Sequence, residues 1–325
     1  MLFGLKCFSV TMKPMQKLFT GLQPSGTLHI GNYFGALKPT VELAKSHESM
    51  VMVADLHALT TLKDSVALRA NIIGVVKDYI GAGLDPERTV IFQQSQVQEH
   101  TELAWIFECL VTVPFLMQAH AYKDKVAKGI EANAGLFNYP MLMAADILLY
   151  DTDIVPVGAD QRQHVEYARE AATKFNLTYG DVFKEPKEHI LDSFAIVPGT
   201  DGKKMSKSYG NTIPLFGTKD EIAKAVMSIV TDSSGERPEN VYAIHSLFRT
   251  REDLAALYEA NAGKYKNLKE ALIEDIETMV VPMRAARDAI TDEDAKRILA
   301  EGSAKAREIA VGKMKEVREK IGVLV

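Results

Sequence analysis

The sequence predicts an α/β protein, with helices on both faces of a doubly wound parallel sheet, followed by an all-helical region. Three observations favour this fold class. Short apolar runs alternate with helical patterns as far as about Pro214, and beyond Pro214 the strand signals stop. The length of 325 residues exceeds what one compact core usually contains and suits two.

Five short apolar runs are expected to be strands, and helical patterns lie between them. The apolar spacing that follows Asp64, a residue type that caps helix N-termini, predicts one such helix. The expected strands are residues 18–20, 50–54, 89–93, 154–157 and 194–197, and the expected helices are residues 32–47, 64–80, 101–111, 135–150 and 160–175. In the helical region, Thr218 with Glu221 and Thr291 with Asp294 fit the capping-box pattern.

Composition and charge exclude several classes of protein. With 47% hydrophobic and 25% charged residues, the chain is neither disordered nor collagen-like. No apolar run reaches the roughly 18 residues of a membrane-spanning helix, so no membrane partner is expected. Cys7 and Cys109 are too few for a disulfide framework, which favours a cytoplasmic location. The net charge of −5 still permits a nucleic-acid partner through a local basic surface.

The first motif that carries chemistry spans residues 23–32, between the first strand and the first helix. Gly26 and Gly31 let a backbone approach a ligand closely. A helix N-terminus presents unpaired N–H groups and partial positive charge to an anion. His29 and Asn32 are three residues apart and share one face of the first turn. This geometry suits a triphosphate, although an ordinary glycine-rich turn has the same pattern.

The second motif is a lysine-rich loop at residues 203–208, flanked by Gly202 and Gly210. Lysines in a flexible loop can close over phosphate oxygens as mobile point charges. A solvated charged loop is the alternative interpretation. The loop follows the expected strand 194–197, however, and ligands of parallel sheets bind beyond the carboxyl ends of strands.

The third motif contains Gly158, Asp160 and Gln161, again between a strand and a helix. Gly158 permits close approach, and Asp160 can accept hydrogen bonds from ribose hydroxyls. Gln161 can both donate and accept. A helix cap at Asp160 is a compatible alternative.

In this order, the three motifs resemble those of the class I aminoacyl-tRNA synthetases. The two signatures of that family, HIGH and KMSKS, read here as His29-Ile30-Gly31-Asn32 and Lys204-Met205-Ser206-Lys207-Ser208. Asn32 in place of the last His resembles the tryptophanyl branch, bacterial type, as do residues 19–26, 143–150 and 153–161. The resemblance runs from about Leu18 to the C-terminus and is most specific in the first two hundred residues. It departs at residues 118–125, where Ala121 stands in place of a glutamine that helps hold the amino acid in many members.

This resemblance implies the ATP-dependent attachment of L-tryptophan to tRNA(Trp) through a tryptophanyl-adenylate, with release of AMP and pyrophosphate. It implies a Rossmann-like catalytic domain at residues 18–211, after an N-terminal extension at residues 1–17 with no assigned function. Residues 212–302 are expected to form a helical anticodon-binding domain, and the last helix, about 303–325, is expected to pack back on the catalytic domain. The expected partners are tRNA(Trp), L-tryptophan, ATP and a second copy in a homodimer.

The resemblance also assigns site residues, position by position. The catalytic donors are His29, Asn32, Lys204 and Lys207. The residues expected to bind ATP are Gln23, Ser25, Gly26, Gly31, Asn32, Gly158, Asp160, Lys204, Met205, Ser206 and Lys207. Mg²⁺ is expected to bridge phosphate oxygens, without a metal site made by the protein itself. The residues expected to bind tryptophan are Phe19, Gly21, His57, Tyr139, Met143, Asp146, Val155, Val157 and Gln161.

Asp146 is the most informative of these residues, because it interrupts an apolar helix. A buried carboxylate is costly unless it is paired. An indole has one N–H donor and no acceptor, so a buried carboxylate complements it. Phenylalanine would leave that carboxylate unpaired, which gives strong discrimination. A salt bridge from Asp146 to a neighbouring helix is the alternative.

Three other functions remain open on the sequence. A tyrosyl-type synthetase shares the fold but needs partners for a phenol, and the segment from Met143 to Asp146 argues against it. A non-catalytic tRNA-binding paralogue is a second alternative, against which the intact KMSKS sequence argues. Another nucleotidyltransferase could share the first motif, but it would need neither a helical domain nor Asp146.

Overall fold

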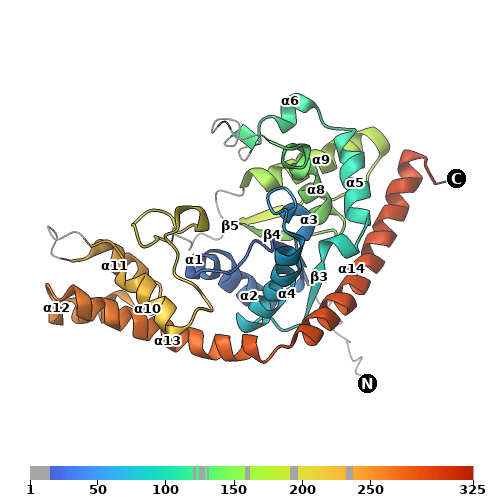
Figure 1. The fold of residues 1–325 in the computed structure, drawn as a ribbon. Helices are drawn as coiled ribbons and strands as arrows, with labels where there is room; N and C mark the ends of the chain where they lie inside the picture. The colour runs from blue at the N-terminus through green and yellow to red at the C-terminus, as the bar shows by residue number, and fades with distance from the viewer. Residues whose placement is uncertain are drawn as a thin grey trace, which may run out of the picture.

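The computed structural model describes residues 15–119, 122–123, 129, 132–157, 162–190, 197–231 and 237–324, and only the backbone at residues 157 and 188–190. Within these residues a parallel sheet carries helices on both faces, and a helical region lies to one side of it (Figure 1). The α/β fold class predicted from the alternating patterns is therefore confirmed. Most of the expected N-terminal extension lies outside the described residues.

The sheet has five parallel strands in the described part of the chain, in the order β3-β2-β1-β4-β5. Leu18 of the central strand pairs with Ser49 on one side and Ile154 on the other. The chain therefore leaves β1 in opposite directions in its two halves, which creates a switch point at the carboxyl ends of β1 and β4, where ligands bind in such sheets. The strands are β1 (Lys17–Leu22), β2 (Glu48–Val53), β3 (Thr89–Gln93), β4 (Ile154–Val157) and β5 (Lys187–Ile190).

β5 is a strand that the sequence analysis did not predict. Its sequence, Lys-Glu-His-Ile, has no apolar run. Among the described strands it has a neighbour on one side only, an edge position at which polar side chains are tolerated. The strand expected at residues 194–197 falls, except for Val197, outside the described residues.

Helices occupy most of the rest of the described chain. None of them is long and apolar enough to cross a membrane. Those that precede the lysine loop are α1 (Ile30–Asn32), η1 (Tyr33–Leu37), α2 (Lys38–Ala44), α3 (Asp55–Ala58), α4 (Ser65–Gly81), η2 (Gln94–Gln96), α5 (Glu99–Glu108), α6 (Val113–Leu116), α8 (Ala134–Leu148) and α9 (Arg162–Tyr179). Those from the loop onward are η4 (Lys207–Tyr209), α10 (Lys219–Met227), α11 (Glu239–His245), α12 (Arg251–Ala260), α13 (Tyr265–Asp288) and α14 (Asp292–Ile321).

The first helix differs from its prediction at both ends. It begins at Ile30, widens into a π-helix over Tyr33–Leu37 and ends at Ala44. Pro39 lies just after the π-helix and has no N–H to give to the backbone ladder, which is consistent with the local change in hydrogen bonding.

The predicted helix caps are confirmed. Asp64 accepts hydrogen bonds from the backbone N–H groups of Val66 and Ala67 at the start of α4. The Thr218–Glu221 capping box opens α10, and the matching box of Thr291 opens α14. Each box satisfies backbone N–H groups that the helix itself leaves without partners.

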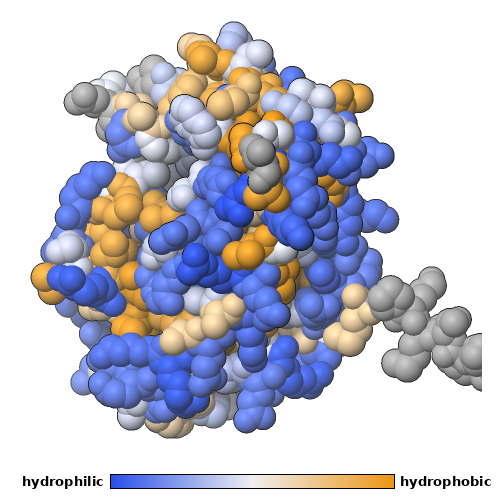
Figure 2. Space-filling model, turned by 90° about the vertical axis from the view of Figure 1, so that its right-hand side faces the viewer, coloured by the Kyte–Doolittle hydropathy of each residue, from blue (hydrophilic) through white to orange (hydrophobic). Residues whose placement is uncertain are grey.

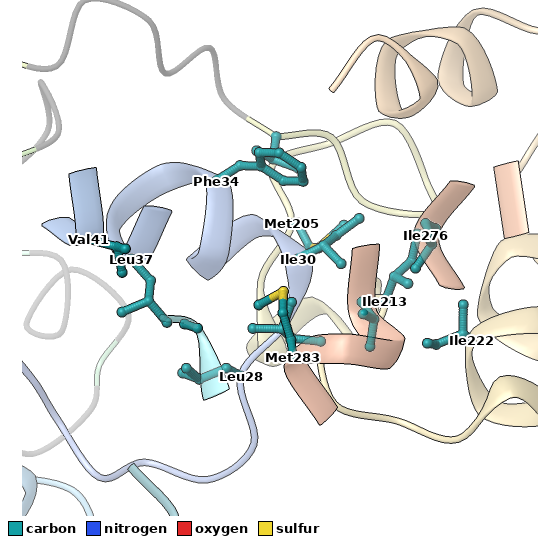
Figure 3. Packing of buried hydrophobic residues seen from close by; sticks show 14 of the residues in the cluster. Leu28, Ile30, Phe34, Leu37, Val41, Met205, Ile213, Ile222, Ile276 and Met283 are labelled. Atoms are coloured by element: carbon teal, nitrogen blue, oxygen red, sulfur yellow. The ribbon is translucent and has the colours of Figure 1, made fainter. Parts of the chain in front are cut away.

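Alternate residues of the strands point to opposite faces and build two hydrophobic cores. Val51 and Ile91 belong to the core that also receives α4 and α13. Met52 and Phe92 belong to the core beneath α5, α8 and α9. Figure 3 shows part of the first core, in which residues of α1, α10 and α13 meet, so the helical region shares a core with one face of the sheet.

The long helix α14 lies along the edge strand β3 and beside α5 (Figure 1). Ser303 of α14 accepts a hydrogen bond from the backbone N–H of Gln93 at 3.1 Å. A β-carbon at Gly302 would overlap the backbone carbonyl of Ile91, so only glycine allows this approach. Arg318 forms a bidentate ion pair with Glu102 of α5. The helix α14 thus covers the edge of the sheet that β3 forms.

Candidate active site

The glycine-rich turn places His29 and Asn32 at the start of α1, where they cap each other. The Asn32 backbone N–H donates to His29 Nδ1 at 3.2 Å, and the His29 backbone N–H donates to Asn32 Oδ1 at 3.1 Å. The sequence therefore correctly places the two side chains on one turn. Their local hydrogen bonds form a capping box with histidine in the role usually taken by serine or threonine.

This reciprocal cap determines which atoms of the pair face a ligand as donors. Because His29 Nδ1 accepts a hydrogen bond, the neutral ring carries its hydrogen on Nε2. Because Asn32 Oδ1 accepts a hydrogen bond, the Nδ2 group is the donor end of the amide. Burial, and then the charge of Lys207, lower the pKa of His29 to about 4. At neutral pH the pair therefore presents two neutral donors.

Backbone hydrogen bonds on both sides of His29 join the glycine-rich turn to the chain that follows the lysine loop. His29 and Pro214 form an antiparallel bridge, in which Ile30 N–H donates to Ile213 O at 3.0 Å and Leu215 N–H donates to Leu28 O at 2.9 Å. These bonds join the start of α1 to the chain that follows the loop. The two motifs, about 180 residues apart in the sequence, are thereby neighbours at one end of the sheet.

Met205 anchors the loop from within. Its side chain is buried in the first core beside Ile30 (Figure 3), and its backbone N–H donates to Val197 O at 2.9 Å. A β-carbon at Gly31 would lie 2.9 Å from His29 Nδ1 and 3.3 Å from the Met205 β-carbon. Gly31 is thus the point of closest approach between the two motifs. Because its side chain is in the core, only the main chain of Met205 is available to a ligand.

Lys207 reaches from the loop over the glycine-rich turn. Its ammonium group donates to the carbonyl oxygens of Ser25 at 3.3 Å and Gly26 at 3.1 Å. Desolvation lowers the pKa of Lys207, while the charge of Asp78 on α4 acts in the opposite direction. Ser206 contacts Ser208 at 2.9 Å, and Lys204 is exposed on the same loop.

Asp146 lies on α8 and is fully buried in a network of nitrogen donors. His57 Nε2 is 2.8 Å from Asp146 Oδ2, and Gln94 Nε2 donates to both carboxylate oxygens at 2.9 and 3.0 Å. His100 Nδ1 lies 2.6 Å from Oδ1. The structure therefore shows the expected alternative, a salt bridge to neighbouring helices, and Asp146 is not a lone carboxylate. Burial raises the pKa of Asp146, but the attraction and hydrogen bonds of His100 and His57 outweigh it and lower the pKa to about 2.

Aromatic and apolar side chains surround this network. Phe19 of β1 is buried and stacks on Tyr150 with 5.5 Å between ring centroids. Tyr139 meets the ring of His57 edge-on, and its hydroxyl lies 2.7 Å from His164 Nε2. Burial, with a smaller effect of Tyr167, raises the pKa of Tyr139 to about 12. Of the other expected pocket residues, Val155 is buried, Met143 is half-buried and Gly21 is exposed at the end of β1.

Several expected site residues fall outside the described part of the chain. These are Gly158, Asp160 and Gln161, together with the side chain of Val157 and, in the divergent segment, Ala121. Gln23, Ser25 and Gly26 belong to the described turn, where Gly26 has a φ of +100° that favours glycine. Among the described residues, no cluster of His, Cys, Asp or Glu is arranged to hold a metal ion.

Sequence reasoning missed Gln94, His100 and Tyr150, which complete the Asp146 network. His100 Nε2 lies 2.7 Å from the Tyr150 hydroxyl. Gln94 directly follows β3, so the rule that functional groups gather at the carboxyl ends of strands could have pointed to it. His100 and Tyr150 sit within ordinary helical and apolar patterns, and no local signal distinguishes them. Asp78 was likewise not predicted from the sequence; it interacts with Lys207 and is paired with Arg287 at 2.6 Å.

A cavity of about 550 Å³ lies near the lysine loop, on its α10 side. Thr27, Thr212 and Lys224 are among the residues that line it. None of the residues of the Asp146 network lines this cavity, so it is distinct from the expected amino-acid pocket.

Comparisons with known proteins agree with this geometry. The model of the tRNA synthetases class I (W and Y) family matches residues 13–295. A tryptophan–tRNA ligase from Fusobacterium nucleatum is 46% identical over 95% of this chain and 99% of its own length. A second, from Rhodopirellula baltica, is 44% identical over 94% of this chain and 99% of its own length. The crystal structure of Campylobacter jejuni tryptophanyl-tRNA synthetase, complexed with ADP and tryptophan, is similar at a TM-score of 0.88 and 41% identity, covering 94% of this chain and 100% of that one.

The resemblance first carried by the HIGN and KMSKS sequences is thus confirmed over nearly the whole chain. A family model that spans most of the sequence, and relatives more than 40% identical, leave one conclusion: this chain belongs to the class I tRNA synthetases of the tryptophan and tyrosine family.

Proposed function

We propose that this protein attaches L-tryptophan to tRNA(Trp) with the use of ATP, through a tryptophanyl-adenylate. The observation that carries the proposal is the position of Lys207 over the glycine-rich turn, at the same edge of the sheet as the buried carboxylate of Asp146. One feature suits a nucleotide phosphate and the other suits an indole. The relatives named tryptophan–tRNA ligases and the neighbour complexed with ADP and tryptophan support the same assignment.

In the first step, the tryptophan carboxylate attacks the α-phosphorus of ATP, and the bond to pyrophosphate breaks. The nucleophile is already an anion, so the step needs no general base. Rate enhancement then comes from positioning and from donors that stabilise the charge of the pentavalent phosphate. His29 Nε2 and Asn32 Nδ2 are the neutral donors that the capping box holds in place, and Lys204 and Lys207 supply positive charge.

The phosphates are held between the turn and the lysine loop. Gln23, Ser25, Gly26 and Gly31 belong to the turn, and Met205 and Ser206 belong to the loop. Gly158 and Asp160 hold the ribose in this proposal. Mg²⁺ arrives with ATP, because the donors at the turn are amides, an imidazole and ammonium groups rather than the carboxylates that would bind it directly. When bound, it offsets the negative charge of the phosphate oxygens.

The amino-acid pocket lies on the other side of β1. Phe19, Met143, Val155 and Val157 form its apolar walls beside Gly21, and Tyr139 and Gln161 hold the α-amine. The indole N–H donates to Asp146, whose two oxygens offer about four acceptor positions. Because the four contacts to the carboxylate already fill these positions, the ligand takes the place of one of them. We assign this displacement to His57. Of the three donors, His57 is the one whose ring contacts Tyr139, a residue that holds the α-amine of the amino acid in this proposal.

In the second step, a hydroxyl of the terminal ribose of the tRNA attacks the adenylate carbonyl and releases AMP. The helical region of residues 212–302 reads the tRNA in this proposal, next to a catalytic domain at residues 18–211. Exposed basic residues of α14 are interleaved with glutamates, which is typical of a solvated face. We therefore assign α14 to the support of the sheet rather than to tRNA contact.

A homodimer is the proposed assembly, and α5 and α6 are its proposed interface. Trp105 of α5 is 67% exposed, and Val113 and Met117 at α6 are 61% and 49% exposed. Figure 2 shows that apolar side chains form patches on a face that is otherwise mostly hydrophilic, and α5 is on the side of Figure 1 that this view brings forward. Trp105 is the single tryptophan of the chain, so its emission reports on burial. Dilution of a dimer should shift that emission to the red, and Val113→Glu should give a monomer in sedimentation.

The proposed location is the cytoplasm, where the tRNA and ATP of protein synthesis are available. The two cysteines of the sequence fit a reducing compartment, and Cys109 is exposed and unpaired with any described cysteine.

Amino-acid-dependent ATP–pyrophosphate exchange tests the function directly. Purified protein with each amino acid in turn should exchange label only with tryptophan, and transfer of labelled tryptophan to tRNA(Trp) should follow. Exchange driven by tyrosine would identify the tyrosyl alternative. The absence of exchange, with retained tRNA binding, would identify a non-catalytic paralogue.

A further inference from the structure

The strongest unassigned feature is the group of polar side chains on the far side of Asp146. His100 of α5 is fully buried and contacts Asp146 Oδ1 through Nδ1, at 2.6 Å. Its other ring nitrogen lies 2.7 Å from the hydroxyl of Tyr150, which is 2% exposed. The ring also stacks on Phe92, with 6.0 Å between centroids. His100 is thus fixed in place by Asp146, Tyr150 and Phe92.

The Tyr150 hydroxyl determines the tautomer of His100. Burial, and then the charges of Asp146 and Glu99, raise the pKa of Tyr150 well above its ordinary value. The hydroxyl therefore keeps its proton and can donate it to His100 Nε2. With Nε2 as the acceptor, Nδ1 carries the hydrogen and lies 2.6 Å from Asp146 Oδ1, a close electrostatic contact that lacks the alignment of a hydrogen bond.

We propose that His100, oriented by Tyr150, is a positioning residue that holds the Asp146 carboxylate ionised and in place for the indole N–H. The inference rests on the proposed function. In the proposed function the ligand replaces His57, and among the described residues His100 and Gln94 then remain in contact with the carboxylate. His100 therefore sets the selectivity for tryptophan without contact with it.

The proposal predicts a specific change in ligand preference. A suitable probe is 3-benzothienyl-L-alanine, in which sulfur replaces the indole N–H while the ring shape is nearly kept. If the carboxylate is well held, the loss of a hydrogen bond to it should weaken binding by about 10- to 150-fold. In His100→Leu, this ratio should collapse towards one, because tryptophan loses affinity and the sulfur analogue does not. A merely structural defect would weaken both ligands alike.

His100→Asn and Tyr150→Phe keep the test decisive if His100→Leu does not fold. The Asn amide occupies nearly the position of Nδ1, so His100→Asn should retain most of the preference for tryptophan. Tyr150→Phe removes only the hydroxyl and should reduce the preference by about 2- to 12-fold. Tyr258→Phe is the matched control, because Tyr258 contacts His245, which contacts Asp275, in the same Tyr–His–Asp order within the helical region.

The pH profile gives a second readout. The titratable groups that face this network are His57 on α3, Glu99 and His100 on α5, and Tyr150 after α8. Without the hold of His100, burial should favour the neutral form of Asp146, and kcat/KM for tryptophan should then decline towards acid pH. The decline should appear in His100→Leu but not in His100→Asn, and the comparison cancels the effects of groups that both variants retain.

The experiment combines calorimetric binding of both ligands with pyrophosphate exchange at pH 5.5 to 8, for the wild type and the four variants. A collapsed preference in His100→Leu, or a reduced one in Tyr150→Phe, with His100→Asn and Tyr258→Phe close to the wild type, supports the proposal. An unchanged preference in folded Tyr150→Phe overturns it, as does an unchanged preference without an acid decline in folded His100→Leu. If the wild type itself shows no exchange with tryptophan, the proposed function fails instead. This result differs from an active wild type whose variants keep an unchanged preference for tryptophan.

Discussion

The ammonium group of Lys207 lies 3.1 Å from the carbonyl oxygen of Gly26 and so connects the lysine loop to the glycine-rich turn. In this arrangement the backbone carbonyls of the turn accept the hydrogen bonds that triphosphate oxygens would otherwise accept. A phosphate carries more charge than a carbonyl dipole, so ATP should draw the ammonium away from the turn. In the proposed function, Lys207 then both supports the loop through these carbonyls and binds the phosphates of ATP.

Lys207→Ala should lower kcat for adenylate formation more than it raises KM for ATP. The reason is that an ammonium group matched to the developing charge acts in the transition state. By comparison with single donors of this kind, we expect a loss of about 10²-fold or more in kcat. Single-turnover kinetics of adenylate formation measure this loss. Lys219→Ala removes an exposed lysine from the start of α10 and is the charge-matched control; a change confined to KM would contradict a transition-state role.

Gly31→Ala should damage the same step for a steric reason. The added methyl group would press on both His29 and the Met205 β-carbon, as the contact distances at Gly31 show. We expect a loss in kcat/KM for ATP together with a destabilisation of about 1–3 kcal/mol, the usual result of overpacking. Chemical denaturation and exchange kinetics measure the two effects. Gly35→Ala, where nothing lies within 4 Å of an added β-carbon, should be close to neutral in both.

Stability should depend on pH through His29. Its folded pKa, about 4, is below the ordinary 6.5, so the unfolded chain binds a proton more readily than the folded one. The free energy of unfolding should therefore decrease as the pH falls from about 6.5 to 4, by at most roughly 3 kcal/mol. His29→Asn keeps a good capping residue and does not titrate. Denaturation at several pH values should show a smaller acid decrease in this variant, and parallel curves would exclude His29 as the source.

Asp146→Ala tests the proposed contact with the indole together with the buried network that the structure shows around this carboxylate. Loss of the hydrogen bond from the indole should raise KM for tryptophan by about 10- to 150-fold. Loss of the carboxylate also leaves His57, His100 and Gln94 without their buried partner, at a cost of about 3–5 kcal/mol in stability. Exchange kinetics and thermal unfolding separate these effects. A large stability loss with an unchanged tryptophan KM would assign Asp146 to the core alone.

The stability that the ionised Asp146 carboxylate contributes should also be insensitive to moderate acid. Its folded pKa, about 2, is below the ordinary value near 4, so the charged form contributes stability at all higher pH values. This contribution should disappear only as the pH falls from about 4 through 2. Comparison of wild type with Asp146→Asn over this range measures it, and a loss well above pH 4 would contradict Asp146 as the source.

How much the sequence could predict differs between the two halves of the site. The phosphate side is coded locally: the glycines, His29 and Asn32 are within one turn of helix, and the capping rules place them. The Asp146 side is coded by long-range contacts, since Gln94 and His57 reach it from 52 and 89 residues away. A single carboxylate in an apolar helix is visible in the sequence, but its partners are not. For the same reason the polar edge strand β5 was missed, because pairing rather than hydrophobicity makes it a strand.

Gly302→Ala should be strongly destabilising. A β-carbon at this position would overlap the carbonyl of Ile91, so α14 would have to move off β3. The change would also loosen the hydrogen bond from Gln93 to Ser303. We expect a loss of several kcal/mol, beyond the usual overpacking cost of about 1–3 kcal/mol. Gly312→Ala lies on the same helix with nothing within 4 Å, and it should stabilise the protein by about 0.5–1 kcal/mol. Thermal unfolding of the two variants measures the difference.

The position of α14 also implies a delay during synthesis, because β3 is made long before the helix that covers it. Gln93 of β3 and Ser303 of α14 are 210 residues apart. At a translation rate of about 5–20 residues per second, the strand waits roughly 10–40 seconds on the ribosome before its covering helix exists. During that interval one edge of the sheet is open to other nascent chains, and two neighbouring ribosomes on one messenger bring such edges together. A chaperone that shields extended segments early in synthesis would therefore benefit the yield of this protein more than one that acts after release.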